Sequence, residues 1–221
     1  RILYTEFPEI AQAYTKNNIK KLFTISTPGI GVLSRMPITN IDDFKGLKIR
    51  SLGTNMSRMF KAAGAVPVSF AWSDVLDGLY KKIIDGTMSN MSLARDNKMH
   101  EVAPYVLWLG QKLLPAHAVS YAYAMNLDRW NKLPADVKRI ILEESKKVEM
   151  SYAKYSLMEQ PLASKQMERE GAKVHVFSQK DLDEWGARLG DIETLAAKEL
   201  DEQGHSGTAS MALIKKLAKL S

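Results

Sequence analysis

The sequence predicts an α/β fold, because helical and strand-like segments alternate along most of the chain. From Lys21 to Met125, short stretches that alternate apolar and polar residues are separated by stretches whose apolar residues recur at helical spacing. Hydrophobic residues make up 45% of the 221 residues, which is enough for a sizeable buried core. After Leu133 the pattern changes to long amphipathic helices. This order is typical of layered α/β proteins.

The elements up to residue 125 are short. Apolar residues at helical spacing predict helices over 7–18 and 55–63, and Ser73 is a candidate cap for a third helix that continues to Ile83. Met88 begins a further strand or loop, which a polar helix over 94–101 follows. Two glycines in the loop over 26–31 permit close approach of backbone to a ligand. Strands are expected over 21–25, 32–34, 47–52, 66–68 and 119–125.

The C-terminal part is mainly helical. An apolar stripe after Pro134 predicts a long helix that continues to Glu170, and Pro161 either bends it or divides it into two. No Gly/Ser-rich linker occurs, so two lobes would have to be joined by crossing strands, near 27–31 and 116–121. Further elements are expected over 174–177 (strand), 182–200 (helix) and 209–220 (helix).

Composition excludes several classes of protein. Lysine and arginine total 31 against 25 acidic residues, for a net charge of +6 and a pI near 9.3. The lysine surplus is spread along expected helices without interleaved aromatic residues, so we expect no nucleic-acid partner. The absence of cysteine excludes disulfide bonds, cysteine-ligated zinc and thiol nucleophiles. No apolar run reaches the roughly 18 residues that a membrane-spanning helix needs.

Catalytic machinery is not visible in the sequence. The four histidines are scattered without the spacing of metal ligands, and no nucleophile elbow or phosphate-binding loop occurs. His117 is the least ordinary of them, because it precedes an expected strand in a loop that contains Pro115. We therefore predict no catalytic residues, no metal and no cofactor.

Arg50 is the strongest candidate for binding chemistry. It ends an expected buried strand just before a loop that opens a helix. A guanidinium offers two parallel donors to a carboxylate, and a helix N-terminus adds unpaired N–H groups. Taken alone, the same pattern also fits a surface ion pair.

An ordered set of motifs around Arg50 decides between these interpretations. The chain resembles the solute-binding proteins of TRAP transporters, the DctP type, over nearly its whole length and in the correct order. The set comprises Phe-Lys-Gly-Leu-Lys-Ile-Arg over 44–50, Gly-Ala-Val-Pro over 64–67, Trp-Ser-Asp-Val over 72–75, Ile-Asp-Gly over 84–86, Leu-Ser-Arg-Met-Pro-Ile over 33–38 and Asn-Leu-Asp-Arg-Trp-Asn-Lys-Leu-Pro over 126–134.

The resemblance implies a periplasmic-binding-protein-like fold of two α/β lobes with crossing strands and long bracing helices. Residues 1–29 and 119–221 would form an incomplete first lobe, and residues 30–118 a second lobe that carries the carboxylate site. The implied function is a periplasmic, extracytoplasmic receptor that binds a small organic acid and delivers it to membrane permease subunits. The alternatives are an enzyme or a regulatory effector module on a similar fold, and a helical interaction protein if the α/β alternation is false.

The resemblance also assigns roles to residues. Arg50 corresponds to the arginine that grips the ligand carboxylate, and Trp72 to an aromatic residue of the pocket. Ile30 stands where many members carry a second arginine, so we expect a monocarboxylate with an apolar or aromatic body. Ser89 and Asn90 would hydrogen-bond its polar groups. The expected lining residues are Phe70, Trp72, Met88, Leu114, Ile30 and His117.

Members of the family are longer at the N-terminus and carry a secretion signal. This sequence begins at Arg1 and shows neither feature. We therefore expect it to be the C-terminal portion of such a protein, with the N-terminal part of the first lobe missing.

Overall fold

The computed structural model describes residues 6–27, 30–109 and 119–218 and divides into two compact units. The first unit comprises Arg1–Ser26, Ser120–Lys154 and Asp191–Ser221. The second comprises Thr27–Val119 and Tyr155–Gly190. The chain therefore passes between the units after Ser26 and again after Val119. Both points lie close to the segments, near 27–31 and 116–121, that were expected to join two lobes.

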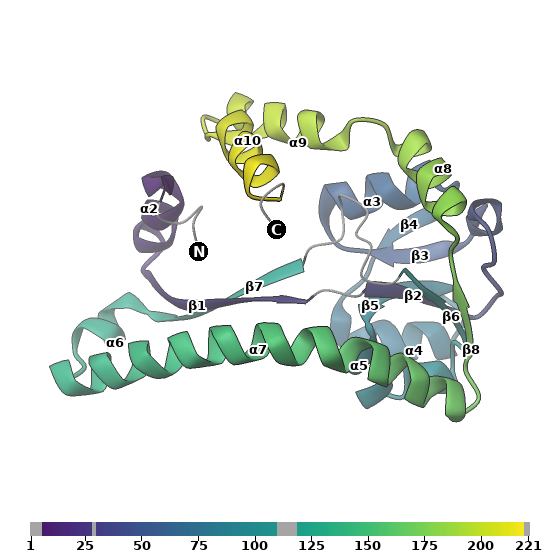
Figure 1. Ribbon diagram of the computed structural model, residues 1–221, viewed down its shortest axis with the longest axis horizontal. Coiled ribbons are helices and arrows are strands. Elements are labelled where there is room, and N and C mark those ends of the chain that lie inside the picture. Colours follow the sequence, from purple (N-terminus) through teal and green to yellow (C-terminus); the bar gives the residue numbers. More distant parts are fainter. Residues whose placement is uncertain (1–5, 28–29, 110–118, 219–221) are drawn as a thin grey trace. The chain divides into compact units, whose positions relative to one another are not determined.

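The second unit is built on a six-stranded sheet in the order β4-β3-β5-β2-β6-β8 (Figure 1). Strand β2 runs antiparallel to β5 and β6, and the other pairs are parallel, so five of the six strands share one direction. Pro67, which has no N–H to donate, lies in the edge strand β4, where no neighbour on one side needs that donor. The strands are β2 (Ile30–Ser34), β3 (Lys48–Ser51), β4 (Val66–Ser69), β5 (Gly86–Asn90), β6 (Tyr105–Trp108) and β8 (Lys173–Val176).

Helices cover both faces of this sheet, as its parallel strands require. On one face, α3 (Gly53–Ala62), α8 (Gln179–Leu189) and the 3₁₀ turn η1 (Ile41–Phe44) enclose a core around Trp185, whose Nε1 donates to the Met59 carbonyl oxygen at 2.9 Å. A second core on the other face contains Leu33, Leu79, Met91 and Met167. Its elements are η2 (Trp72–Asp74), α4 (Val75–Tyr80), α5 (Met91–Asp96), η3 (Met99–Glu101) and the C-terminal part of α7 (Ala135–Arg169).

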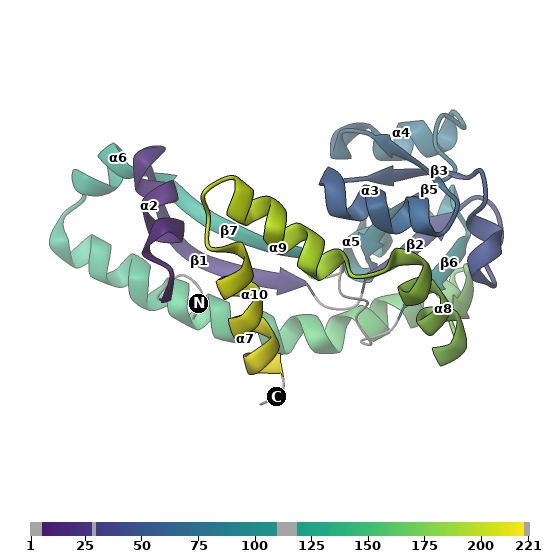
Figure 2. The same cartoon turned by 90° about the horizontal axis from the view of Figure 1, so that it is seen from above.

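The first unit has a two-stranded sheet of β1 (Ile19–Thr27) and β7 (Val119–Asn126). The rings of Phe23 and Tyr123 stack across it, with centroids 4.5 Å apart. Helices α9 and α10 pack against each other near the C-terminus (Figure 2). The helices of this unit are α2 (Pro8–Lys16), α6 (Leu127–Asn131), the N-terminal part of α7, α9 (Ile192–Glu202) and α10 (Gly207–Ala218).

Three features differ from the sequence-based expectations. Residues 155–190 belong to the second unit and not to the lobe of 119–154, because β8 pairs with β6 and α8 packs on α3. Helix α7 continues through Pro161, so the two-helix alternative is wrong. The helix expected over 182–200 is two helices, because Gly190 adopts φ +68° between α8 and α9.

Ser73 does not cap a helix, since its hydroxyl donates to Asp74. Among the described residues, no helix combines the length and the apolar character that crossing a bilayer requires.

A Gly86→Ala substitution should destabilise the second unit. A Cβ at Gly86 would lie 2.7 Å from the Leu33 carbonyl oxygen and 2.8 Å from Ile49 Cδ1, and both belong to packed neighbouring strands. Overpacking of this kind costs about 1–3 kcal/mol. Gly186→Ala is the matched control, because this glycine in α8 has open space around it and the change should leave stability equal or higher. Urea unfolding monitored by circular dichroism would measure both. Equal midpoints for the two variants would contradict this account of the sheet.

Candidate functional site

The expected binding residues gather at one edge of the six-stranded sheet. Strands β3, β4 and β5 end at this edge, and antiparallel β2 begins there, so that Ile30 pairs with Asn90. The carboxyl ends of parallel strands are the usual location of ligands in open α/β sheets. Two of the expected residues, Leu114 and His117, lie outside the described residues.

The Arg50 side chain runs along the sheet toward this edge. Its Nε donates to the carbonyl oxygen of Phe70 at 3.0 Å. Since Arg50 pairs with Val68 on β4, this acceptor lies two residues nearer the carboxyl edge. The guanidinium also lies over the Trp72 ring, 5.3 Å from its centroid. Arg50 is only 3% exposed, so an ion placed against it would interact through little solvent.

Phe70 and Trp72 form the apolar surroundings of Arg50. Both side chains are half-buried and pack against the second core. A Cβ at Gly78 would lie 2.7 Å from the Phe70 ring, so α4 can approach the ring this closely only because that residue is glycine. A cation beside an aromatic face contributes on the order of 0.5–2 kcal/mol, which helps to hold the buried guanidinium.

Side-chain alternation separates the other expected residues. Thr87 pairs with Arg50, so Ser89, two residues further along β5, shares the face of Arg50. The Ser89 hydroxyl donates to the Asn90 carbonyl oxygen at 3.0 Å. Ile30 and Met88 are 3% and 5% exposed and pack in the core on the opposite face. The described apolar surface beside Arg50 is therefore that of Phe70 and Trp72.

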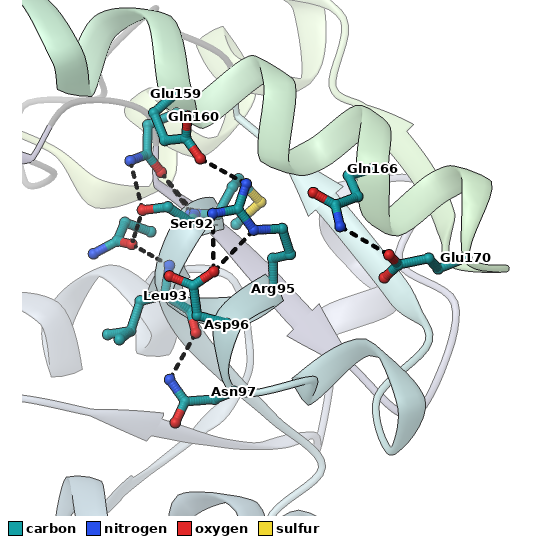
Figure 3. Close-up of polar contacts among 11 residues, drawn as sticks. Ser92, Leu93, Arg95, Asp96, Asn97, Glu159, Gln160, Gln166 and Glu170 are labelled. Carbon is teal, nitrogen blue, oxygen red and sulfur yellow. Dashed lines mark hydrogen bonds and ion pairs between the residues drawn. The ribbon is translucent and has the colours of Figure 1, made fainter.

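Asn90 caps α5 in a network with α7. Figure 3 labels Ser92, Leu93 and Gln160 of this network. Its Oδ1 accepts from the Leu93 N–H at 2.8 Å and from the Ser92 hydroxyl at 3.1 Å. Gln160 of α7, which is 2% exposed, accepts from the N–H groups of Met91 at 2.7 Å and Ser92 at 3.2 Å. All three N-terminal N–H groups of α5 therefore have protein acceptors.

Gln160 was missed by the sequence reasoning. It lies 69 residues from Met91 in the sequence. The neighbouring Pro161 predicts a change in the helix backbone, but it does not predict a polar contact of the adjacent side chain. No local pattern places a glutamine of a long helix at the start of another helix.

An ion pair strengthens the same contact between α5 and α7. Arg95 Nη1 lies 2.6 Å from Glu159 Oε1, with both side chains less than one fifth exposed, and Asp96 also accepts from Arg95 (Figure 3). Burial lowers the pKa of Arg95, but the hydrogen bonds to Glu159 and Asp96 outweigh it and raise the pKa above its usual value. The arginine therefore stays charged, and the pair fixes α5 beside the edge that Asn90 occupies.

A Gln160→Ala substitution should destabilise the second unit. It leaves the N–H groups of Met91 and Ser92 without their acceptor at a buried position, and this costs about 1–3 kcal/mol. Gln166→Ala on the same helix is the matched control, because Gln166 is exposed and its side chain donates to the equally exposed Glu170 carboxylate one turn further along. Thermal unfolding of both variants measures the difference. A melting temperature as high for Gln160→Ala as for the control would contradict the anchoring role.

Comparison with known proteins identifies the family of the chain. A family model described as bacterial extracellular solute-binding protein, family 7, matches residues 2–196. The C4-dicarboxylate-binding periplasmic protein DctP of Rhodobacter capsulatus is 35% identical over 103 residues, which cover 46% of this chain and 29% of that protein. The matched regions span less than half the length of the curated relatives.

Solved structures resemble the chain over most of its length. The periplasmic ectoine-binding protein of the TeaABC TRAP transporter of Halomonas elongata has a TM-score of 0.82 at 18% identity, covering 96% of this chain and 68% of that one. DctP7 of Bordetella pertussis, an extracytoplasmic solute receptor binding pyroglutamic acid, has a TM-score of 0.80 at 19% identity, covering 93% and 66%. At these identities the likeness shows the fold, and it confirms the two-lobed α/β class predicted from the sequence.

Proposed function

Because the chain belongs to the bacterial extracellular solute-binding proteins of family 7, we propose that it is a receptor for a small organic acid. In this proposal the acid is bound through its carboxylate at the carboxyl edge of the second unit's sheet. The receptor acts outside the cytoplasm and delivers the acid to the membrane subunits of a TRAP-type transporter. It has no catalytic step, so ligand should bind one to one and be recovered unchanged.

The position of Arg50 is the observation that carries the proposal. A cation that is 3% exposed lies at the end of a parallel strand, where it is oriented by the Phe70 carbonyl oxygen and the Trp72 ring. A guanidinium held in this way can bind a carboxylate through two parallel N–H donors. A carboxylate there would have much of its negative charge compensated by a guanidinium already held in place.

The surroundings of Arg50 support a ligand with one carboxylate and an apolar body. Phe70 and Trp72 supply the apolar surface. Ile30, which stands where the family resemblance led us to look for a second arginine, packs on the opposite face of the sheet and brings no charge to the site. A second carboxylate placed against Phe70 and Trp72 would be desolvated without a compensating charge. Ser89 and Asn90 would hydrogen-bond the polar groups of the body.

Arg50→Ala should weaken binding by roughly thirtyfold to several thousandfold, because losing one partner of a buried charged pair costs about 2–5 kcal/mol. Arg50→Lys should recover only part of the loss, since an ammonium keeps the charge but not the planar two-donor edge. Calorimetric titration with the best carboxylate of the panel described below measures all three proteins.

Arg188→Ala is the control for this experiment. It removes the same charge from the same unit at a surface ion pair with Asp42 and Glu184, so affinity should not change. Wild-type affinity in a folded Arg50→Ala protein would refute the assignment of the site.

A panel of acids should rank monocarboxylates with apolar or aromatic bodies above dicarboxylates and sugar acids. A ligand at a hundredfold excess over its Kd stabilises the native protein by about 2.7 kcal/mol, so a thermal shift detects it. The panel should include succinate, a sialic acid, pyroglutamate, 4-methyl-2-oxopentanoate and their analogues. Tightest binding of the dicarboxylate or the sugar acid would reject the proposed selectivity and leave the receptor function in place.

A further inference from the structure

The polar network at the start of α5 fixes the orientation of the Asn90 amide. Backbone N–H groups can only donate, so the Gln160 atom facing Met91 and Ser92 must be its oxygen. The Gln160 Nε2 group then points at the Ser92 hydroxyl, 3.1 Å away, and donates to it. The Ser92 hydroxyl therefore turns its own hydrogen toward Asn90 Oδ1, which lies at 3.1 Å.

Asn90 Oδ1 is thus held from two sides, since the Leu93 N–H also donates to it at 2.8 Å. Rotating the amide by half a turn would place its NH₂ group against that N–H and against a hydroxyl already committed as a donor. The oxygen consequently faces α5, and the NH₂ group is directed away from these donors. Among the described residues, no acceptor is found for this NH₂ group, and Asn90 is only half-buried.

We propose that Gln160 is a positioning residue for ligand recognition, acting through Ser92 to make Asn90 a hydrogen-bond donor to the ligand. This inference rests on the proposed function and deepens it. Asn90 lies three residues beyond Thr87, the partner of Arg50, which is about 10 Å along the strand. Although it pairs with Ile30 at the end of β5, its side chain turns there toward α5, whose Met91 and Ala94 pack in the same core as Phe70 and Trp72. The long Arg50 side chain spans part of the interval along the strand, so one small ligand could contact both groups.

The proposal defines the class of ligand more closely. Both Arg50 and Asn90 present donors, so the site selects an acid that carries a second acceptor, a carbonyl or hydroxyl oxygen, outside the carboxylate. An acid of the same shape without this oxygen leaves the Asn90 donor unpaired and loses affinity.

Two pairs of acids test this selectivity. Pyroglutamate and cyclopentanecarboxylate share a five-membered ring, and only the first has a ring carbonyl. The acids 4-methyl-2-oxopentanoate and 4-methylpentanoate differ in one keto oxygen beside the carboxylate. Calorimetric titration should give the wild type at least a severalfold preference for the oxygen-bearing member of one pair.

Gln160→Glu is the informative variant. The introduced carboxylate can still accept from the N–H groups of Met91 and Ser92, but its second oxygen cannot donate to Ser92. The Ser92 hydroxyl must then donate to that carboxylate, and Asn90 loses one of the two donors that orient it. The preference should fall to about twofold or less, while affinity for the oxygen-free acid stays within about twofold. Gln166→Glu makes the same chemical change on the exposed side of α7 and should keep the wild-type preference.

Two further variants keep the test valid if Gln160→Glu folds poorly. Asn90→Asp retains an oxygen to cap α5 but replaces the donor by a charged acceptor, so the oxygen-bearing acid should lose about tenfold or more. Ser92→Ala removes the hydroxyl that connects Gln160 to Asn90. Adding Gln160→Glu to this variant should therefore cause no further loss of preference for the oxygen-bearing acid.

The outcomes separate the inference from the function on which it rests. If carboxylates bind through Arg50 but the wild type shows no preference within either pair, the inference is wrong and the receptor function stands. An unchanged preference in both Gln160→Glu and Asn90→Asp would also overturn it. If Arg50→Ala does not affect binding, or no carboxylate binds at all, the proposed function itself fails.

Discussion

The parallel pairing of β3 between β4 and β5 is the constraint on which the arrangement of the second unit depends. Parallel neighbours cannot be joined by a tight turn, so the chain must cross over through α3 and then through η2 and α4. Those crossovers bury both faces of the sheet and create two cores. The same pairing brings the carboxyl ends of three strands to one edge, where Arg50, Phe70 and Asn90 come from different parts of the sequence.

Burial gives this edge its chemical character. A guanidinium with 3% exposure would be costly without directed contacts, and here a carbonyl oxygen and an indole ring supply two of them. The fold therefore stabilises and orients the cation before any ligand arrives. Because the Arg50 side chain is already ordered, it loses little conformational entropy when a ligand binds, which favours affinity.

Helix α7 links the same edge to the rest of the second unit. Gln160 and Glu159 lie side by side on it, one holding the N–H groups at the start of α5 and the other pairing with Arg95. The apolar side of this part of α7 packs in the second core through Ala163 and Met167. Polar capping and apolar packing thus both act between α5 and this part of α7, so the position of Asn90 depends on residues far away in sequence.

The α/β class, most strand positions and the place of Arg50 at a strand end could be predicted from the sequence, because these follow from local periodicity and from an ordered set of motifs. The sequence could not separate Ile30 and Met88 from Arg50, since opposite faces of a sheet become apparent only when strand register is known. It also joined α8 and α9 into one helix, although the left-handed backbone at Gly190 divides them. The packing of residues 155–190 with the second unit and the contact of Gln160 with α5 became apparent only in the folded chain. Both outcomes depend on contacts between residues that are distant in the chain, and such contacts leave no periodic signal in the sequence.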